Sequence, residues 1–324
     1  MKRMCCALCA ALLLALCGCT AQTVRREFFA MDTVMTVSTC GGQAALDVVE
    51  DEIYRLDGLL SAQSGASEIS AVNSGAEAVS AETAALLARA LEIAAETDGA
   101  YDPTVYPLMR AWGFTDGNYR VPEQEELDTL LQTTGWAEVS VDGTQVSLPE
   151  GFALDLGGIG KGYAAGRCKE ILSEHGVTSA LLSLGGNVSA LGSKPDGTAW
   201  TVAIEDPDGG DWLGTVKVID QCVVTSGGYQ RYFEQDGVRY WHILDPETGK
   251  PARSGMKSVT IVSGDDTLAD ALSTALFVMG PEKAANFWLA HRAEFGAVWL
   301  TEDGQLFVTE GLTLTTEREY EVVS

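Results

Sequence analysis

The spacing of apolar residues along the chain predicts amphipathic helices in three segments. Apolar side chains recur every three or four residues over 44–60, 80–99 and 161–175, which gives each segment one face that can be buried. Ser80 opens the second segment and suits a helix N-cap, and Gly176 follows the third and suits a helix end. Each of these helices is expected to pack one face against a core.

Short runs of apolar and β-branched residues predict strands. The runs are FFAMDTVMTVST, ALLSLGG, WTVAIED, GTVKVID, CVVTSG, VRYWHILD and SVTIVSG. Hairpins are expected around Asp142-Gly143 and over GAVWLTEDGQLFVTEG, and further helices over DTLADALSTALFVMG and from Pro281 onward. Residues 100–125 are expected to form a loop. Because helices and strands are interspersed without a repeat or a clear linker, the chain is predicted to form one α+β domain over residues 27–324, with mixed and antiparallel sheets packed against helices.

The glycine-rich stretch LDLGGIGKGYAAG, residues 154–166, matches neither common phosphate-binding loop. A P-loop needs glycine where Asp155 stands and Ser or Thr where Gly162 stands, and the dinucleotide fingerprint needs glycine where Tyr163 stands. Two interpretations remain open. Free N–H groups at a helix start, together with Lys161, can bind phosphate while Asp155 contacts a sugar, base or ring. Alternatively, the glycines only permit a tight turn from strand to helix.

The most apolar predicted helix contains a carboxylate. Asp270 and Thr274 are four residues apart in ADALSTALFVMG, so they lie on one helix face among apolar neighbours. A buried carboxylate needs a partner, and Mg²⁺, which prefers oxygen ligands, would satisfy both side chains. The alternative is that Asp270 interacts with the helix dipole while Thr274 bonds to a backbone carbonyl. The apolar setting favours the metal.

Two other stretches contain candidate functional side chains. His242 stands in a predicted strand before the turn DPETG, whereas His175 and His291 lie near predicted helix ends, where capping explains them. His242 can be a satisfied core histidine or a catalytic base. The stretch DGAYDPTVYPLMRAWGF contains Tyr101, Asp102 and further aromatic residues, which can stack on a planar ring or pack beneath the loop.

Net charge and the first residues indicate a secreted protein. A formal net charge of −25 leaves no basic surface for nucleic acid. Two basic residues precede an apolar stretch too short to cross a bilayer, which ends in Leu-Cys-Gly-Cys19. We predict a lipoprotein signal peptide over residues 1–18, lipidation of Cys19 and a tether over residues 19–26. The alternative is an ordinary secretory signal that is cleaved nearby.

Taken together, these stretches resemble the FAD:protein FMN transferase family, known as the ApbE family. The matching blocks occur in the order typical of the family, from Met31 to about Gly280. They are MDTVMTV, SEISAVN, GAYDPTVYPL, LDLGGIGKGYA, LLSLGGNV, VVTSGGYQRYF, HILDPETGKP and ADALSTALFVMG. Each block is weak alone, but the ordered set is specific. The resemblance implies a single T-fold-like α+β domain and an extracytoplasmic protein that is lipid-anchored to the bacterial cell membrane.

The resemblance also implies a reaction and its partners. FAD would be the donor substrate, Mg²⁺ the cofactor, and a threonine hydroxyl of an acceptor flavoprotein the target, with release of AMP. The family's usual acceptors are subunits of membrane redox pumps or secreted flavoproteins. They carry a short motif of the form Asp-x-x-(Ser/Gly)-(Ala)-Thr. Since this chain contains no clear copy of that motif, it is not expected to flavinylate itself.

The resemblance further assigns roles to individual positions. Ligands of Mg²⁺ are expected at Gly158 (through its carbonyl), Asp270 and Thr274. Contacts with FAD are expected at Met31, Tyr101, Asp102, Asp155, Lys161 and Ile243. The acceptor threonine needs a base because its hydroxyl is un-ionised at neutral pH, and His242 is the candidate. Asp270 or the substrate itself is the rival for that role.

One position departs from the family pattern. Gln63 stands in LSAQSGASE where a tyrosine is common, which affects the expected contact on the adenine side. The departure leaves open a Mg²⁺-dependent FAD pyrophosphatase, in which water attacks in place of threonine and the products are FMN and AMP. A third hypothesis is a lipid-anchored flavin-binding protein without turnover. Asp270 and Thr274 speak against it, because flavin binding alone needs no metal.

Overall fold

The computed structural model describes residues 23–324 and has a nine-stranded sheet at its centre. Neighbouring strands are antiparallel throughout, except for the parallel pair at the end of the sheet, β16 and β17. In spatial order the strands are β1 (Thr23–Ala30), β2 (Thr33–Cys40), β5 (Ala180–Leu184), β6 (Asn187–Leu191), β9 (Cys222–Gly227), β14 (Met256–Ser263), β15 (Phe295–Thr301), β16 (Leu306–Thr309) and β17 (Glu321–Val323).

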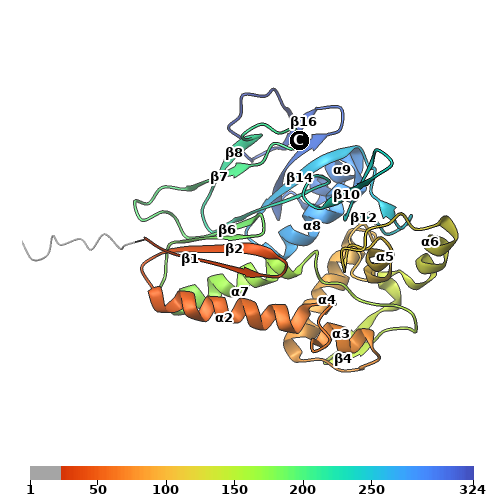
Figure 1. Cartoon of the computed structure of the whole chain (residues 1–324). Coiled ribbons are helices and arrows are strands. Elements are labelled where there is room, and N and C mark those ends of the chain that lie inside the picture. The colour runs from red at the N-terminus through yellow and green to blue at the C-terminus, as the bar shows by residue number, and fades with distance from the viewer. Residues whose placement is uncertain (1–22) are drawn as a thin grey trace, which may run out of the picture.

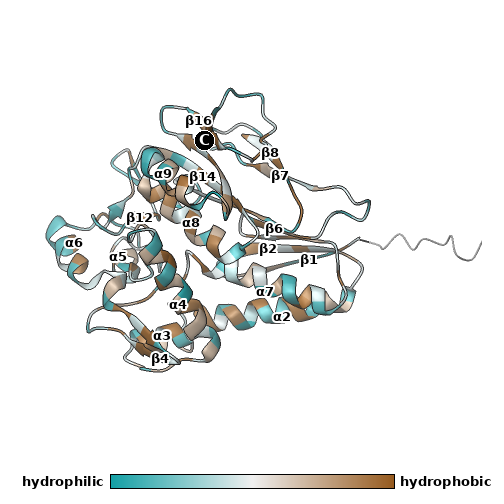
Figure 2. Cartoon of the chain, turned by 180° about the vertical axis from the view of Figure 1, so that it is seen from behind, coloured by the Kyte–Doolittle hydropathy of each residue, from teal (hydrophilic) through white to brown (hydrophobic). Residues whose placement is uncertain are grey.

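Helices cover one face of this sheet and enclose the larger core (Figure 1). The helices that contact the sheet are α2 (Gln43–Leu60), α7 (Gly160–Glu174), α8 (Asp266–Met279) and α9 (Pro281–His291). Helix α3 (Glu68–Asn73) packs on α2, and α4 (Ala81–Glu96) packs on α8, so both extend the same core beside the sheet. Helix α8 packs on β9 and β14 and is covered by α7, so nearly all of its side chains are buried, in keeping with its apolar sequence. Helix α2 carries both teal and brown residues along its length, as expected of a helix with one buried face (Figure 2).

A separate hairpin covers the other face of the sheet. Its strands are β7 (Trp200–Ile204) and β8 (Gly214–Val218), which pair in antiparallel fashion. Apolar residues of this hairpin and of β14, β15 and β16 form a second core. The part of the sheet around β14, β15 and β16 is therefore buried on both faces, whereas β1 and β2 keep exposed side chains such as Phe29 and Val34.

A smaller lobe lies beside α4 and α8 and has an aromatic core (Figure 1). Trp112 anchors the lobe, because its indole N–H donates to the carbonyl of Gly249 over 2.7 Å. The lobe contains α5 (Tyr106–Ala111), α6 (Gln124–Leu130), two 3-10 turns (Leu131–Thr133 and Trp136–Glu138) and the paired strands β10 (Tyr232–Gln235) with β11 (Val238–Trp241) and β12 (Leu244–Asp245) with β13 (Lys250–Pro251). A further hairpin of β3 (Ser140–Asp142) and β4 (Gln145–Ser147) contacts α4.

The predicted α+β class with a single domain is confirmed, and so are the three periodic helices, which correspond to α2, α4 and α7. Ser80 caps α4 as predicted, since its hydroxyl accepts from the N–H of Thr83 over 3.3 Å. The predicted hairpin at Asp142-Gly143 is β3–β4. Periodicity and capping residues were sufficient for these elements because their packing is regular.

Four local predictions were wrong. The segment FFAMDTVMTVST, expected to be one strand, contains the turn of a hairpin at Met31 and Asp32, with β1 on one side and β2 on the other. The single strand predicted over VRYWHILD is interrupted by a bend at His242, because β11 pairs with β10 whereas β12 pairs with β13. The expected loop over 100–125 contains α5, which Pro107 opens in its first turn. Strand β1 begins at Thr23, inside the predicted tether, and Arg26 attaches it to α2 through Asp47 and Glu50.

The predicted signal peptide and Cys19 lie outside the described residues. Between residues 23 and 324, no helix combines the length and the apolar character needed to cross a bilayer.

Candidate active site

The start of α7 and the second turn of α8 meet at an approach that only glycine allows. A Cβ atom added at Gly162 would lie 2.7 Å from the Cβ of Asp270 and even closer to the backbone oxygen of Asp266. The bare backbone instead brings its N–H to 2.8 Å from Oδ2 of Asp270. The glycine at this position therefore serves close helix packing, and its N–H, which has no acceptor within the helix, binds the Asp270 carboxylate.

Asp270 is buried and has protein partners on two sides. Its side chain is 6% exposed, and its Oδ1 accepts from the Asn187 amide over 2.9 Å. Nζ of Lys161 lies 4.0 Å from the same oxygen. The alternative of a helix-dipole role is not supported by this position, because Asp265 caps α8 and Asp266 occupies its first turn. Asp270 instead binds groups from α7 and β6, which orient its carboxylate.

Thr274 and Gly158 lie next to each other one helical turn from Asp270. A Cβ at Gly158 would be 3.9 Å from the Thr274 hydroxyl oxygen. Within residues 23–324 the Thr274 hydroxyl has no hydrogen bond, whereas the neighbouring Ser273 hydroxyl donates to the carbonyl of Asp270 over 2.8 Å. The predicted alternative of a Thr274 bond to a backbone carbonyl is therefore wrong, and this oxygen is available to a ligand.

These donors fit a small hard cation. A carboxylate, a hydroxyl and a nearby backbone carbonyl are all oxygen ligands, which Mg²⁺ prefers, and it commonly takes one or two carboxylates with water and substrate oxygens. In the part of the chain that the structure describes, no three His, Cys, Asp or Glu side chains gather as a metal site. A cation at Asp270, Thr274 and Gly158 would therefore depend on substrate oxygens to complete its coordination.

Asp155 and Lys161 lie at the two ends of the glycine turn. Oδ1 of Asp155 accepts from the N–H of Gly157 over 2.7 Å, and Nζ of Lys161 lies 3.4 Å from the carbonyl of the same residue. Burial raises the pKa of Asp155, and the Gly157 N–H, Arg231 and Lys161 oppose that rise. The turn thus presents a carboxylate and a partly exposed ammonium group on either side of one short backbone segment.

Tyr101 and Asp102 are neighbours in sequence but differ in their surroundings. The Tyr101 ring lies against Gly158, and its buried hydroxyl has no hydrogen-bond partner within the described residues. Burial raises its pKa well above the usual value, so the group is a neutral donor without an acceptor. Asp102 instead accepts three hydrogen bonds, two from Thr104 (2.8 and 2.6 Å) and one from the N–H of Trp136 (3.0 Å). Its carboxylate therefore stabilises the turn at Thr104 and connects it to the 3-10 turn that begins at Trp136.

His242 is held with its second ring nitrogen unprotonated. Nδ1 lies 3.2 Å from the carbonyl oxygen of Arg231, and because a carbonyl only accepts, Nδ1 carries the hydrogen and Nε2 keeps its lone pair. Removal from water, together with the positive charge of Arg231, lowers the pKa of His242 to about 4. The positive charge of Lys161 acts in the same direction. His242 is therefore a neutral proton acceptor at neutral pH.

The remaining predicted positions form no hydrogen bond or ion pair with Asp270, Thr274 or Gly158 within the described residues. Met31 occupies the β1–β2 turn with a positive φ of 47°, and its N–H donates to Asp57 over 3.0 Å. Ile243 is buried and its carbonyl accepts from Ala252 over 2.9 Å. Gln63 is exposed in the loop after α2.

Comparisons with known proteins identify the family. A model of the ApbE family matches residues 31–299. The chain belongs to the ApbE family. It is 38% identical over 263 residues to the FAD:protein FMN transferase of Treponema pallidum, an alignment that covers 74% of this chain and 73% of that protein. All residues singled out between Met31 and Thr274 lie within the region that the family model covers.

Solved ApbE structures share the whole fold. The Thermotoga maritima ApbE protein superposes with a TM-score of 0.84 at 35% identity, covering 89% of this chain and 97% of that one. The apo form of the flavinyl transferase ApbE from Pseudomonas stutzeri gives a TM-score of 0.78 at 31% identity, covering 91% and 95%. The mixed α+β architecture is therefore that of the ApbE family.

Sequence reasoning missed two residues of this ApbE-family site. Asn187 fixes the Asp270 carboxylate, and its only signal was a polar residue directly after the glycine pair in SLGGNV. The charge of Arg231 helps to lower the pKa of His242 and opposes the rise in the pKa of Asp155. Its signal was a basic residue inside the block VVTSGGYQRYF of an otherwise acidic chain.

Proposed function

We propose that this protein is a Mg²⁺-dependent FAD:protein FMN transferase, which transfers FMN from FAD to a threonine hydroxyl of an acceptor flavoprotein and releases AMP. The junction of α7 and α8 carries the proposal. There the unbonded Thr274 hydroxyl and the oriented Asp270 carboxylate lie beside the Lys161 ammonium group. An oxygen-ligand site next to a partly exposed ammonium group suits a diphosphate, and the relatives' names supply the identity of the substrate.

The reaction requires one bond to form and one to break. The threonine Oγ attacks the phosphorus on the FMN side of the diphosphate, the bond from that phosphorus to the bridging oxygen breaks, and AMP leaves with the bridging oxygen. The threonine proton passes to Nε2 of His242. When bound by Asp270, Thr274 and the Gly158 carbonyl, Mg²⁺ would offset the diphosphate charge. Such a reaction depends mainly on positioning and charge neutralisation.

The other residues bind and orient the substrate in this proposal. Lys161 contacts the phosphates, and the orphaned Tyr101 hydroxyl and Asp155 contact polar groups of FAD. Arg231 holds His242 in its base-competent tautomer through its backbone carbonyl. The charge on Arg231 also favours an anionic substrate nearby.

One incubation distinguishes the possible activities. The protein, FAD and Mg²⁺ are mixed with a carrier protein that displays the Asp-x-x-(Ser/Gly)-Ala-Thr motif, and the carrier is weighed by mass spectrometry while free AMP and FMN are measured by chromatography. A carrier heavier by one FMN, with one AMP per transfer, supports the transferase. Free FMN and AMP with an unmodified carrier would show a pyrophosphatase, and bound but intact FAD would show a flavin-binding protein without turnover.

Replacing Lys161 by alanine is expected to weaken FAD binding about tenfold, because a hydrogen bond to a charged group contributes about 1.5–3 kcal/mol. Riboflavin lacks phosphates, so its binding should change less than about twofold. Quenching of flavin fluorescence measures both affinities. Lys217→Ala, an exposed lysine on β8, is the control and should change neither. Equal weakening of both flavins by Lys161→Ala would mean that this lysine supports the turn and does not bind phosphate.

We also propose that the protein is an extracytoplasmic lipoprotein anchored through Cys19. The basis is the sequence before that cysteine, and β1 begins only four residues after it. Cys19→Ser should abolish lipid attachment and processing at this position and release the protein from the membrane fraction. Mass spectrometry of the N-terminal peptide and detergent phase partitioning measure both effects. Unchanged partitioning of the variant would point to an ordinary secretory signal or another anchor.

A further inference from the structure

The first turn of α7 forms one side of the site, yet it is a weak helix start by itself. It contains Gly160 and Gly162, and glycine inside a helix costs about 1 kcal/mol relative to alanine. Ile159 precedes the helix and provides no side-chain hydrogen bond to its free N–H groups. Contacts from other elements must therefore hold this turn in place.

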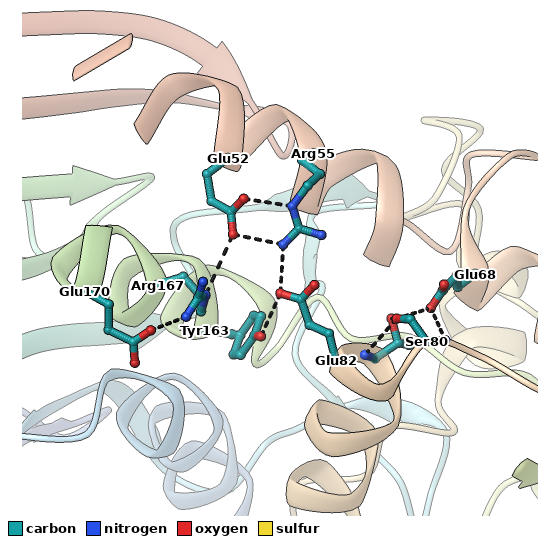
Figure 3. A network of polar contacts seen from close by, with 9 residues as sticks. Glu52, Arg55, Glu68, Ser80, Glu82, Tyr163, Arg167 and Glu170 are labelled. Atoms are coloured by element: carbon teal, nitrogen blue, oxygen red, sulfur yellow. Dashed lines mark hydrogen bonds and ion pairs between the residues drawn. The ribbon is translucent and has the colours of Figure 1, made fainter. Parts of the chain in front are cut away.

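A hydrogen bond from Tyr163 supplies such a contact. The Tyr163 hydroxyl donates to Oε1 of Glu82 on α4 over 2.9 Å, and Nη2 of Arg55 on α2 donates to the same oxygen over 2.8 Å (Figure 3). Burial raises the pKa of Tyr163, and the Arg55 guanidinium lowers the pKa of Glu82. At neutral pH the phenol is therefore protonated and the carboxylate ionised, which gives a charge-assisted bond.

The same cluster reaches α7 a second time, one turn further along. Nε and Nη2 of Arg55 donate to both oxygens of Glu52, over 2.7 and 2.9 Å. Oε1 of Glu52 in turn lies 3.7 Å from Nε of Arg167, four residues after Tyr163 (Figure 3). Helix α7 is thus held at two successive turns by side chains of α2 and α4.

The part of α4 that carries Glu82 is itself fixed. Glu68 of α3 accepts from the N–H and the hydroxyl of Ser80, over 3.0 and 2.9 Å, and Ser80 caps α4 (Figure 3). Glu82 is the acidic residue in the first turn of this capped helix. Its carboxylate is therefore a firm attachment point for Tyr163.

We propose that Tyr163, Glu82 and Arg55 are positioning residues, which fix the first turn of α7 so that Gly162 orients Asp270 and Lys161 faces the phosphates. The proposal rests on the proposed transferase function. The three side chains act through the single peptide that joins Tyr163 to Gly162, and none needs to touch the substrate. Partly exposed ion pairs contribute little to global stability, so we expect the effect at the site and not in the melting temperature.

The test is Tyr163→Phe, which deletes only the hydroxyl. In protein without FAD or metal, amide hydrogen exchange over residues 159–163 should become at least about fivefold faster, since one charge-assisted bond is lost. Calorimetric titration should show Mg²⁺ binding weakened by about fivefold or more. The kcat of flavin transfer should fall about tenfold, and KM for FAD should rise by less than the loss expected for Lys161→Ala, because Lys161 is still present but less well oriented. Tyr54→Phe is the matched control, because that hydroxyl lies 3.5 Å from Glu50 on the exposed side of α2.

A second pair of variants separates local positioning from general stability. Glu82→Gln keeps an acceptor for Tyr163 and should retain most of the exchange protection, whereas Glu82→Ala should behave as Tyr163→Phe. Exchange over 159–163 that matches the Tyr54→Phe control, with unchanged Mg²⁺ affinity, would overturn the proposal. Faster exchange spread evenly over α2, α4 and α7 with a lowered melting temperature would also overturn it. Because the exchange experiment uses neither FAD nor acceptor, its outcome is independent of whether the transferase activity is found.

Discussion

Replacing Asp270 by asparagine is expected to lower the rate of flavin transfer on the order of 10³-fold at a fixed Mg²⁺ concentration. Asparagine keeps the size of the side chain and an oxygen that can accept from the Gly162 N–H, but it removes the negative charge that would hold the cation. Alanine is a poorer test, because it leaves the buried Gly162 and Asn187 donors unpaired, at a cost of about 1–3 kcal/mol each. AMP release over a Mg²⁺ titration measures the effect.

Asp266→Asn is the matched control for this prediction. Asp266 lies one turn earlier on α8, is as buried as Asp270 at 4% exposed, and pairs with Lys169 and Ser189. Its replacement should destabilise the protein while leaving the Mg²⁺ dependence of turnover unchanged. Wild-type Mg²⁺ dependence in Asp270→Asn, or equal losses in the two variants, would contradict the assignment of Asp270 as a metal ligand.

The sequence predicted that Asp270 needs a partner but not which groups provide it. A carboxylate among leucine and alanine residues is visible in the sequence because its burial is costly. Its actual partners, Gly162 and Asn187, stand 108 and 83 residues away and reach it only because α7 and β6 pack beside α8. Contacts of this range depend on the topology of the sheet, which a local pattern does not contain.

The same limit explains which elements were predicted. Helices α2 and α4 have regular periodicity, and α4 also has a capping residue, so they could be placed from the sequence. Strand β6, with the sequence NVSAL, was missed because its polar residues face other protein groups, for example Ser189, which donates to Asp266. Strand β1 carries Arg25 and Arg26 close to its start, and two basic residues resemble a solvated tether. Only the structure shows that Arg26 pairs with Asp47 and Glu50 of α2.

His242→Ala is expected to slow flavin transfer by about 10²–10⁴-fold at neutral pH, with FAD and Mg²⁺ binding retained. The imidazole is held by Arg231 with Nε2 free, so its removal deletes the proton acceptor and no substrate-binding charge. Asp270 is a weaker candidate for this role, because both of its oxygens already accept hydrogen bonds. His175→Ala is the matched control. That ring lies 2.8 Å from the Ile171 carbonyl at the end of α7, and its loss should leave transfer unchanged.

The pH dependence of the same variant tests the role of His242 as a base. With a pKa of about 4, His242 is unprotonated throughout the neutral range, so its protonation should reduce the wild-type rate only when the pH falls toward 4. The ordinary value of 6.5 for the unfolded chain means that His242 also costs stability as the pH falls from 6.5 toward 4, because the unfolded state then binds the proton more tightly. Circular dichroism at each pH must therefore show that the protein is folded.

The His242→Ala variant should lose the part of the fall in rate at acidic pH that protonation of His242 causes. Its rate should approach the wild-type rate above about pH 9, where hydroxide partly replaces the base. Near-normal transfer by the variant at neutral pH, measured by flavin fluorescence on the acceptor, would assign proton removal to the substrate or to Asp270.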